Sequence, residues 1–172
     1  MFFLRRSQVG YEILDPYHPF VVAAPGVLPA EGALMDQVIG EIAYVLQSPT
    51  ASSDQRMAAV LALEATRTAS STAALRTAAS GGDLRAKCFA LGALTGRNDI
   101  SLLAEAQRLL LHPPAGADPN WVNAIAYGIR DGVRDTRAVS LLEPLLHASN
   151  VEARRAAAAA IRTIGGPSAI EL

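Results

Sequence analysis

The chain of 172 residues is long enough for one domain with a buried core, and its apolar residues, 51% of the sequence, are mostly the alanine and leucine that favour helices over strands. Fifteen basic residues nearly balance sixteen acidic ones, which leaves a formal net charge of -1 and argues against a nucleic-acid-binding protein, because such proteins usually carry a basic surplus. Cys88 is the only cysteine, so an internal disulfide is excluded, and we expect its thiol to be buried and inert.

Residues 1–30 differ in composition from the rest of the chain. They contain four prolines and the apolar run that starts with Phe20 and Val21, so they predict extended chain, turns or at most a short strand. The segment is too apolar to be a solvated tail. We therefore expect it either to cap the first helices or to dock on a partner through residues such as Phe20 and Val21.

The first residues form a very short apolar run followed by Arg5 and Arg6, which is the reverse of the order in a secretory signal peptide. No stretch approaches the roughly 20 apolar residues that a membrane-spanning helix needs. We therefore expect a cytoplasmic protein. Lys87 is the only lysine, and a chain rich in arginine and alanine is typical of a GC-rich bacterial genome.

From Glu31 onward the apolar residues follow helical spacing, and one amphipathic helix is predicted up to about Gln47. Four later stretches resemble one another: each starts with a polar residue or cluster that can lead into a helix, and each continues with small residues and larger apolar ones. The four stretches are 54–63, 83–92, 120–129 and 151–161. A break and a second helix follow each of them, at about 71–79, 100–111, 136–147 and from 168 onward. Their starts are roughly 30–40 residues apart, a spacing typical of helical-pair solenoids.

The run 137–146 followed by 151–161 resembles a HEAT repeat, and more narrowly the short bacterial type first described in phycobilisome lyases. The likeness covers residues 83–172 well and 54–80 fairly, and it is absent before Glu31. It implies an all-α fold, an α-α superhelix of about four helical pairs over residues 31–172, with the second helices lining a concave face. Pro144 departs from the family pattern and should kink its helix.

Small residues recur in the first helices of the pairs. Gly92 and Gly128 occupy equivalent positions in their repeats, although glycine inside a helix costs about 1 kcal/mol relative to alanine. We therefore expect a tight helix crossing at these two residues.

The leading functional hypothesis is a protein-binding module, meaning an adaptor, chaperone or assembly scaffold that is not an enzyme and needs no cofactor. Helical phase places polar side chains on the concave face, and Trp121 either packs against the preceding loop or anchors a partner. The predicted partner-binding residues of the helical region are Arg76, Glu105, Arg108, Trp121, Glu143 and His147.

The enzymatic interpretations have little support in the sequence. His18, His112 and His147 share no metal-ligand spacing, and neither a phosphate-binding glycine loop nor a nucleophile elbow is present. The resemblance also leaves one enzymatic alternative open, a lyase-type subunit that attaches or removes a chromophore. A further alternative is a homo-oligomer, in which the N-terminal segment or the C-terminal end packs on another copy.

Overall fold

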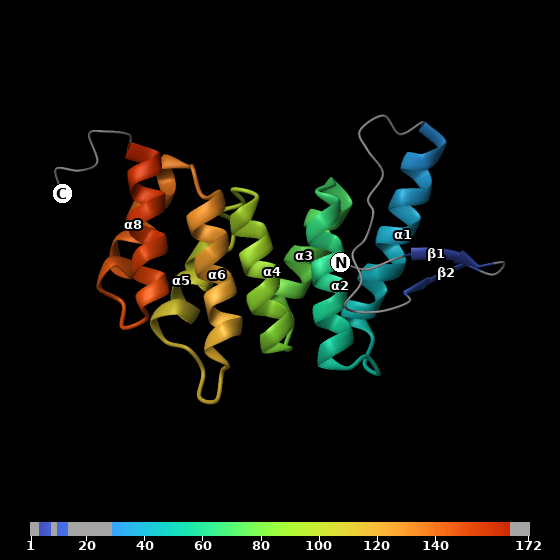
Figure 1. Ribbon diagram of the computed structural model, residues 1–172, viewed down its shortest axis with the longest axis horizontal. Helices are drawn as coiled ribbons and strands as arrows, with labels where there is room; N and C mark the ends of the chain where they lie inside the picture. Colours follow the sequence, from blue (N-terminus) through green and yellow to red (C-terminus); the bar gives the residue numbers. More distant parts are fainter. Residues whose placement is uncertain (1–3, 8–9, 14–28, 166–172) are drawn as a thin grey trace. The chain divides into compact units, whose positions relative to one another are not determined.

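The computed structural model describes residues 4–7, 10–13 and 29–165 (Figure 1). The chain divides into two compact units, Met1–Ala74 and Leu75–Leu172, with the boundary inside helix α3 (Ala69–Ser80). The described residues form eight α-helices, two 3-10 helices and one small β-hairpin. The predicted helical class is therefore confirmed.

Unit 1 holds the hairpin and the first two helices. Strands β1 (Leu4–Ser7) and β2 (Gly10–Ile13) pair antiparallel, in agreement with the expectation of at most short strands before residue 30. Helix α1 (Pro29–Gln47) packs on α2 (Ser53–Thr66), where Ser52 and Gln55 form a capping box that satisfies a backbone N–H at each of the two residues. The apolar core of the two helices includes Ile39, Ile42, Val60 and Leu63.

Unit 2 is built from helices that start at polar caps. Asp83 and Asp118 accept backbone hydrogen bonds at the starts of α4 (Leu84–Gly96) and α6 (Pro119–Gly132). Asn150 does the same for α8 (Val151–Gly165), with bonds of 2.8 and 3.2 Å from the next turn. Such caps satisfy N–H groups that have no partner inside the helix. The three caps therefore stabilise the N-terminal ends of α4, α6 and α8.

The region predicted as one helix over 136–147 is broken. It consists of a 3-10 turn at Thr136–Ala138, the short helix α7 (Val139–Leu142) and a second 3-10 turn at Glu143–His147. The second turn contains Pro144, which has no N–H to donate and whose ring clashes with the preceding helical turn. The predicted kink is confirmed, and the prediction of one continuous helix was wrong.

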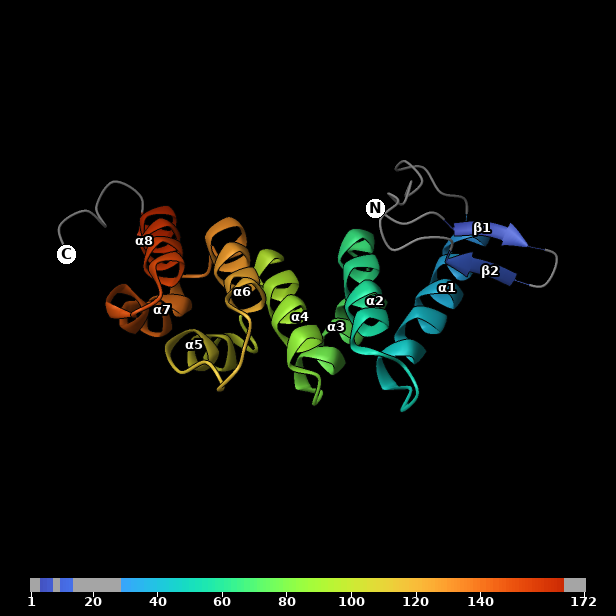
Figure 2. The same ribbon diagram turned by 60° about the horizontal axis from the view of Figure 1, so that its bottom comes forward.

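Within unit 2 the helices form two rows. Helix α6 packs between α4 and α8 in the first row (Figure 2). The second row consists of α5 (Leu103–Leu111), α7 and the 3-10 turn that follows α7. Large side chains from both rows are less than 2% exposed, among them Leu91, Leu94, Leu103, Leu109, Ile125, Ile129, Leu142 and Leu145. The core of unit 2 therefore lies between the rows.

The crossing of α4 and α6 is tight enough to require glycine. A Cβ built at Gly92 would lie 2.5 Å from the Ala124 carbonyl oxygen, and one at Gly128 would overlap the Gly92 carbonyl oxygen and the Thr95 hydroxyl. The predicted close approach at Gly92 and Gly128 is confirmed. It extends one turn further, because a Cβ at Gly132 would overlap the backbone of the last turn of α4.

Candidate functional site

The predicted polar contacts near α5 form ion pairs within unit 2. The guanidinium of Arg108 binds the Glu105 carboxylate through two hydrogen bonds of 2.8 Å, and the Lys87 ammonium lies 3.5 Å from the same carboxylate. The hydrogen bonds from Arg108, aided by the charge of Lys87, hold the pKa of Glu105 below its ordinary value. Glu105 thus links α5 to α4, and Arg108 is the more exposed partner.

Arg76 is paired as well. Its guanidinium lies 2.8 Å from Asp99 in the loop after α4. Burial of Asp99 would raise the pKa of this carboxyl, but hydrogen bonds from Ser101 and Arg76 outweigh burial and hold the pKa below its ordinary value. Because exposed ion pairs contribute only about 0–1 kcal/mol, a partner could replace these contacts at small cost.

Glu143 and His147 are exposed at opposite ends of the second 3-10 turn. Among the described residues, the structure therefore joins Glu105 directly to Arg108 and leaves Arg76, Glu143 and His147 as separate exposed positions. Phe20 and Val21, the predicted contacts of the N-terminal segment, lie outside the described residues.

Trp121 lies in the first turn of α6 and is half-buried. The Arg85 guanidinium of α4 stands over its indole ring, 5.7 Å from the ring centre. Such a cation–π contact contributes roughly 0.5–1 kcal/mol at an exposed site. Trp121 thus packs on the neighbouring helix, a contact that the two interpretations of the sequence did not include.

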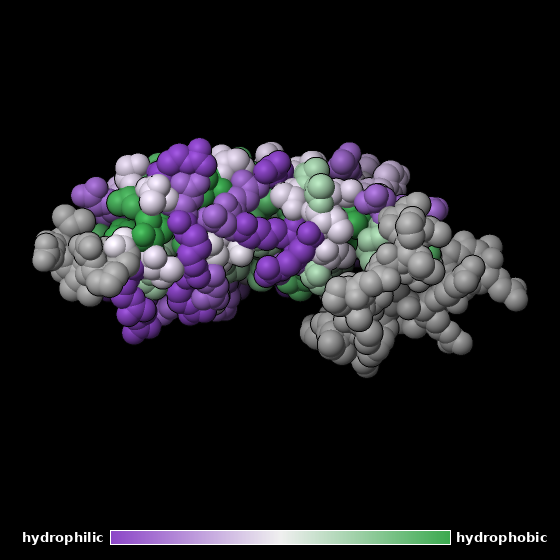
Figure 3. Space-filling view, turned by 90° about the horizontal axis from the view of Figure 1, so that it is seen from above, coloured by the Kyte–Doolittle hydropathy of each residue, from purple (hydrophilic) through white to green (hydrophobic). Residues whose placement is uncertain are grey.

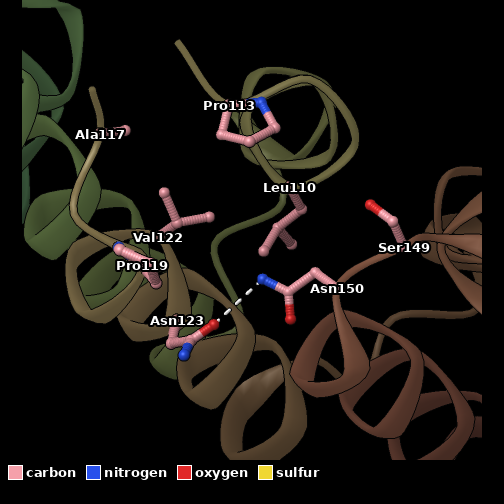
Figure 4. A pocket seen from close by; sticks show the side chains of 8 residues that line it. All are labelled: Leu110, Pro113, Ala117, Pro119, Val122, Asn123, Ser149 and Asn150. Atoms are coloured by element: carbon pink, nitrogen blue, oxygen red, sulfur yellow. Dashed lines mark hydrogen bonds between the residues drawn. The ribbon is translucent and has the colours of Figure 1, made fainter. Parts of the chain in front are cut away.

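A pocket that the sequence did not predict lies beside the first turn of α6. It has a volume of about 320 Å³. It opens between the end of α5, the loop of residues 112–118 that joins α5 to α6, and the residues that precede α8 (Figure 4). Its lining consists of Leu110, Pro113, Ala117, Pro119, Val122, Asn123, Ser149 and Asn150. The sequence signal for this pocket was the set of prolines between the two helices: Pro113 and Pro114 follow the end of α5, and Pro119 begins α6.

The polar side of this pocket is an oriented pair of amides. The Asn150 carbonyl oxygen Oδ1 accepts from the backbone N–H groups of Glu152 and Ala153, so its amide nitrogen must point the other way. That nitrogen donates to Asn123 Oδ1 at 3.0 Å (Figure 4). Because an amide nitrogen carries two hydrogens, Asn150 retains one further donor. No acceptor among the described residues pairs with it.

The edge where α4, α6 and α8 end is rich in charge. Figure 3 looks onto this edge and shows mostly hydrophilic side chains over unit 2, with smaller apolar areas between them. Two arginines there bind neighbouring acids: Arg130 binds Asp131 at 2.7 Å, and Arg137 binds Asp135 at 2.6 Å. Charges of both signs are therefore present at this edge.

Metal-ligating side chains do not cluster in the part of the chain that the structure describes. Over these residues, no three histidine, cysteine, aspartate or glutamate side chains gather closely enough to hold a metal ion. None of their helices is long and apolar enough to cross a membrane. The Cys88 side chain is fully buried, as predicted, and burial raises the pKa of its thiol to about 11.

Comparison of the chain with protein-family models, with curated proteins and with solved structures finds no match in any of the three.

Proposed function

We propose that the chain is a HEAT-like α-solenoid that binds another protein in the cytoplasm, as an adaptor, chaperone or assembly scaffold. The observation that carries the proposal is an internal equivalence at an interval of 36 residues. Gly92 and Gly96 of α4 correspond to Gly128 and Gly132 of α6, and the two pairs face each other at the helix crossing.

The loops after these helices support the same equivalence. Asp99 accepts a hydrogen bond from the backbone N–H two residues later at 3.0 Å, and Asp135, 36 residues further on, does the same at 2.9 Å. Asn98 also accepts from the backbone N–H of Arg134 at 2.7 Å, which joins one loop to the next. Matching helices, glycines and loop bonds are what stacked copies of one helical pair require.

A binding role is supported by the contrast between residues that such repeats use for packing and residues that they leave exposed. The glycines at the crossing of α4 and α6 and the core leucines pack inside unit 2. By contrast, Arg108, Glu143 and His147 are exposed on the second row and have no role in the core. A row of exposed side chains on a rigid support is suited to contact a partner over an extended surface.

The test is affinity purification from the native host with surface variants of the full chain. The second-row variant combines Arg108→Glu with His147→Glu, and the matched control carries Arg162→Glu near the end of α8. We expect wild type and control to retain the same stoichiometric protein partner and the second-row variant to retain at least tenfold less. Equal retention by all three would remove the second row as the contact surface.

The absence of any stoichiometric partner would contradict the proposal itself. The same preparation then separates the two alternatives from the sequence. A visible absorbance band that copurifies with the chain would support the chromophore-lyase interpretation. A mass above that of one chain in light scattering would support self-assembly.

A further inference from the structure

We infer that the pocket beside the first turn of α6 takes one uncharged apolar side chain of a partner polypeptide, while the Asn150 amide donates a hydrogen bond to a backbone carbonyl next to that side chain. This inference rests on the proposed protein-binding function and assigns the chemistry of one contact.

The lining selects for an apolar side chain. Leu110 and Val122 are buried and form its floor, and Pro113, Ala117 and Pro119 form apolar walls (Figure 4). No charged side chain is among the lining residues, so a charged group placed there would lose water without gaining a counter-charge. The volume of about 320 Å³ is at the lower end for ligand pockets. It suits one side chain with its peptide group.

The polar side offers donors to a hydrogen-bond acceptor. The further hydrogen on the Asn150 amide nitrogen and the Ser149 hydroxyl are donors at the pocket. A peptide carbonyl accepts such bonds without bringing a charge. A carboxylate would find no cation among the lining residues. An apolar side chain in an extended segment, with its own carbonyl beside it, meets both conditions.

The pocket is also held in place before any ligand arrives. Asn150 is fixed by its two bonds to α8, and Asp118 caps α6 at 2.8 Å. The Arg154 guanidinium binds the carbonyl oxygens of Ala148 and Ser149 at 2.6 and 2.9 Å. Because these bonds already order the loop before α8, little conformational entropy remains to be lost on binding.

The test is an NMR titration of the full chain with N-acetyl-leucine N-methylamide, which carries one apolar side chain between two peptide groups. N-acetyl-glycine N-methylamide is the control probe, since it has the same peptide groups and no side chain. We expect saturable shifts of the Val122, Asn123 and Asn150 amides with the leucine probe and at least fivefold smaller shifts with the glycine probe.

Three variants assign the effect to the pocket. Ala117→Phe places a ring in the pocket and should reduce the shifts at least fivefold, and Asn150→Asp keeps the cap but removes the donor and should weaken binding severalfold. Ala104→Phe, on the exposed face of α5, is the control and should bind as wild type does. Equal shifts with both probes, or unchanged binding by Ala117→Phe, would overturn the inference.

The failure of this inference can be told apart from that of the proposed function. A protein partner retained equally by wild type and by Ala117→Phe would refute the pocket and keep the binding module. Saturable binding of the leucine probe by a chain that retains no protein partner would refute the module and keep the chemistry of the pocket.

Discussion

Replacing Gly128 with alanine should force α4 and α6 apart, because the added methyl group has no space. A Cβ at this position would overlap the Gly92 carbonyl oxygen and the Thr95 hydroxyl, and it would lie 2.7 Å from the Gly92 carbonyl carbon. Two of these three atoms belong to the backbone of α4 and cannot rotate away. The Thr95 hydroxyl is itself held by hydrogen bonds to the carbonyls of Leu91 and Gly92. Relief therefore requires movement of a whole helix.

The expected change in the free energy of unfolding follows from two opposing effects. Overpacking of a core costs roughly 1–3 kcal/mol, and the better helix propensity of alanine returns about 1 kcal/mol. Because the obstacle at Gly128 is mainly backbone, we place the overpacking cost at the upper end, which leaves a net loss of about 2 kcal/mol in the free energy of unfolding. For a chain of 172 residues that loss lowers Tm by roughly 4–8 °C.

Gly96 supplies the matched control, since it lies in the same crossing but has space. A Cβ there would meet only the Gly128 Cα, at the ordinary contact distance of 3.9 Å. Gly96→Ala should leave the free energy of unfolding unchanged or raise it by up to about 1 kcal/mol through helix propensity. Urea unfolding followed by circular dichroism measures both variants. An equal effect of the two substitutions would refute the reasoning, because it would show that glycine is not selected by space at this crossing.

Three further outcomes are expected. Asn150→Ala should lower the free energy of unfolding by about 1 kcal/mol in urea titrations through loss of the α8 cap, whereas Asn150→Asp should retain most of it. Folding lowers the pKa values of Asp99 and Glu105, so the stability these carboxylates contribute is complete above their unfolded pKa values and is lost as the pH falls through the folded ones. Tm should therefore fall below about pH 4, and the fall should be smaller in Asp99→Asn. The Cys88 thiol, with its pKa raised to about 11, should react with a thiol reagent at pH 8 only after denaturant is added; rapid reaction of the native chain would contradict its burial.

The sequence predicted the elements of unit 2 well because their signals are local. Asp83 marks a helix start by its side chain alone, and Pro144 breaks a helix wherever one is attempted. Gly92 and Gly128 were informative because glycine in the middle of a helix is costly unless close approach requires it. The superhelix and the HEAT assignment stay predictions, since they depend on how successive pairs are oriented.

The site was less predictable because it depends on contacts between distant residues. Asn123 and Asn150 are 27 residues apart, and neither is unusual in its own helix or loop, yet together they form the polar side of the pocket. Trp121 was recognised as a distinctive residue, but its contact with Arg85 of another helix has no local signal. Helical phase identified exposed positions such as Arg108 without revealing that Glu105 binds it.

The repeat interval itself separates positions that maintain the fold from positions that are free to recognise a partner. Across 36 residues, buried positions of the second row keep an apolar side chain, as in Ala106 and Leu142 or Leu109 and Leu145. Exposed positions at the same interval change their chemistry: Ser101 corresponds to Arg137, and Arg108 to Pro144. Packing requires apolar side chains at the same positions of every helical pair, whereas the surface of a partner protein has no such repeat. In the proposed solenoid, specificity must therefore come from the positions at which the repeats differ.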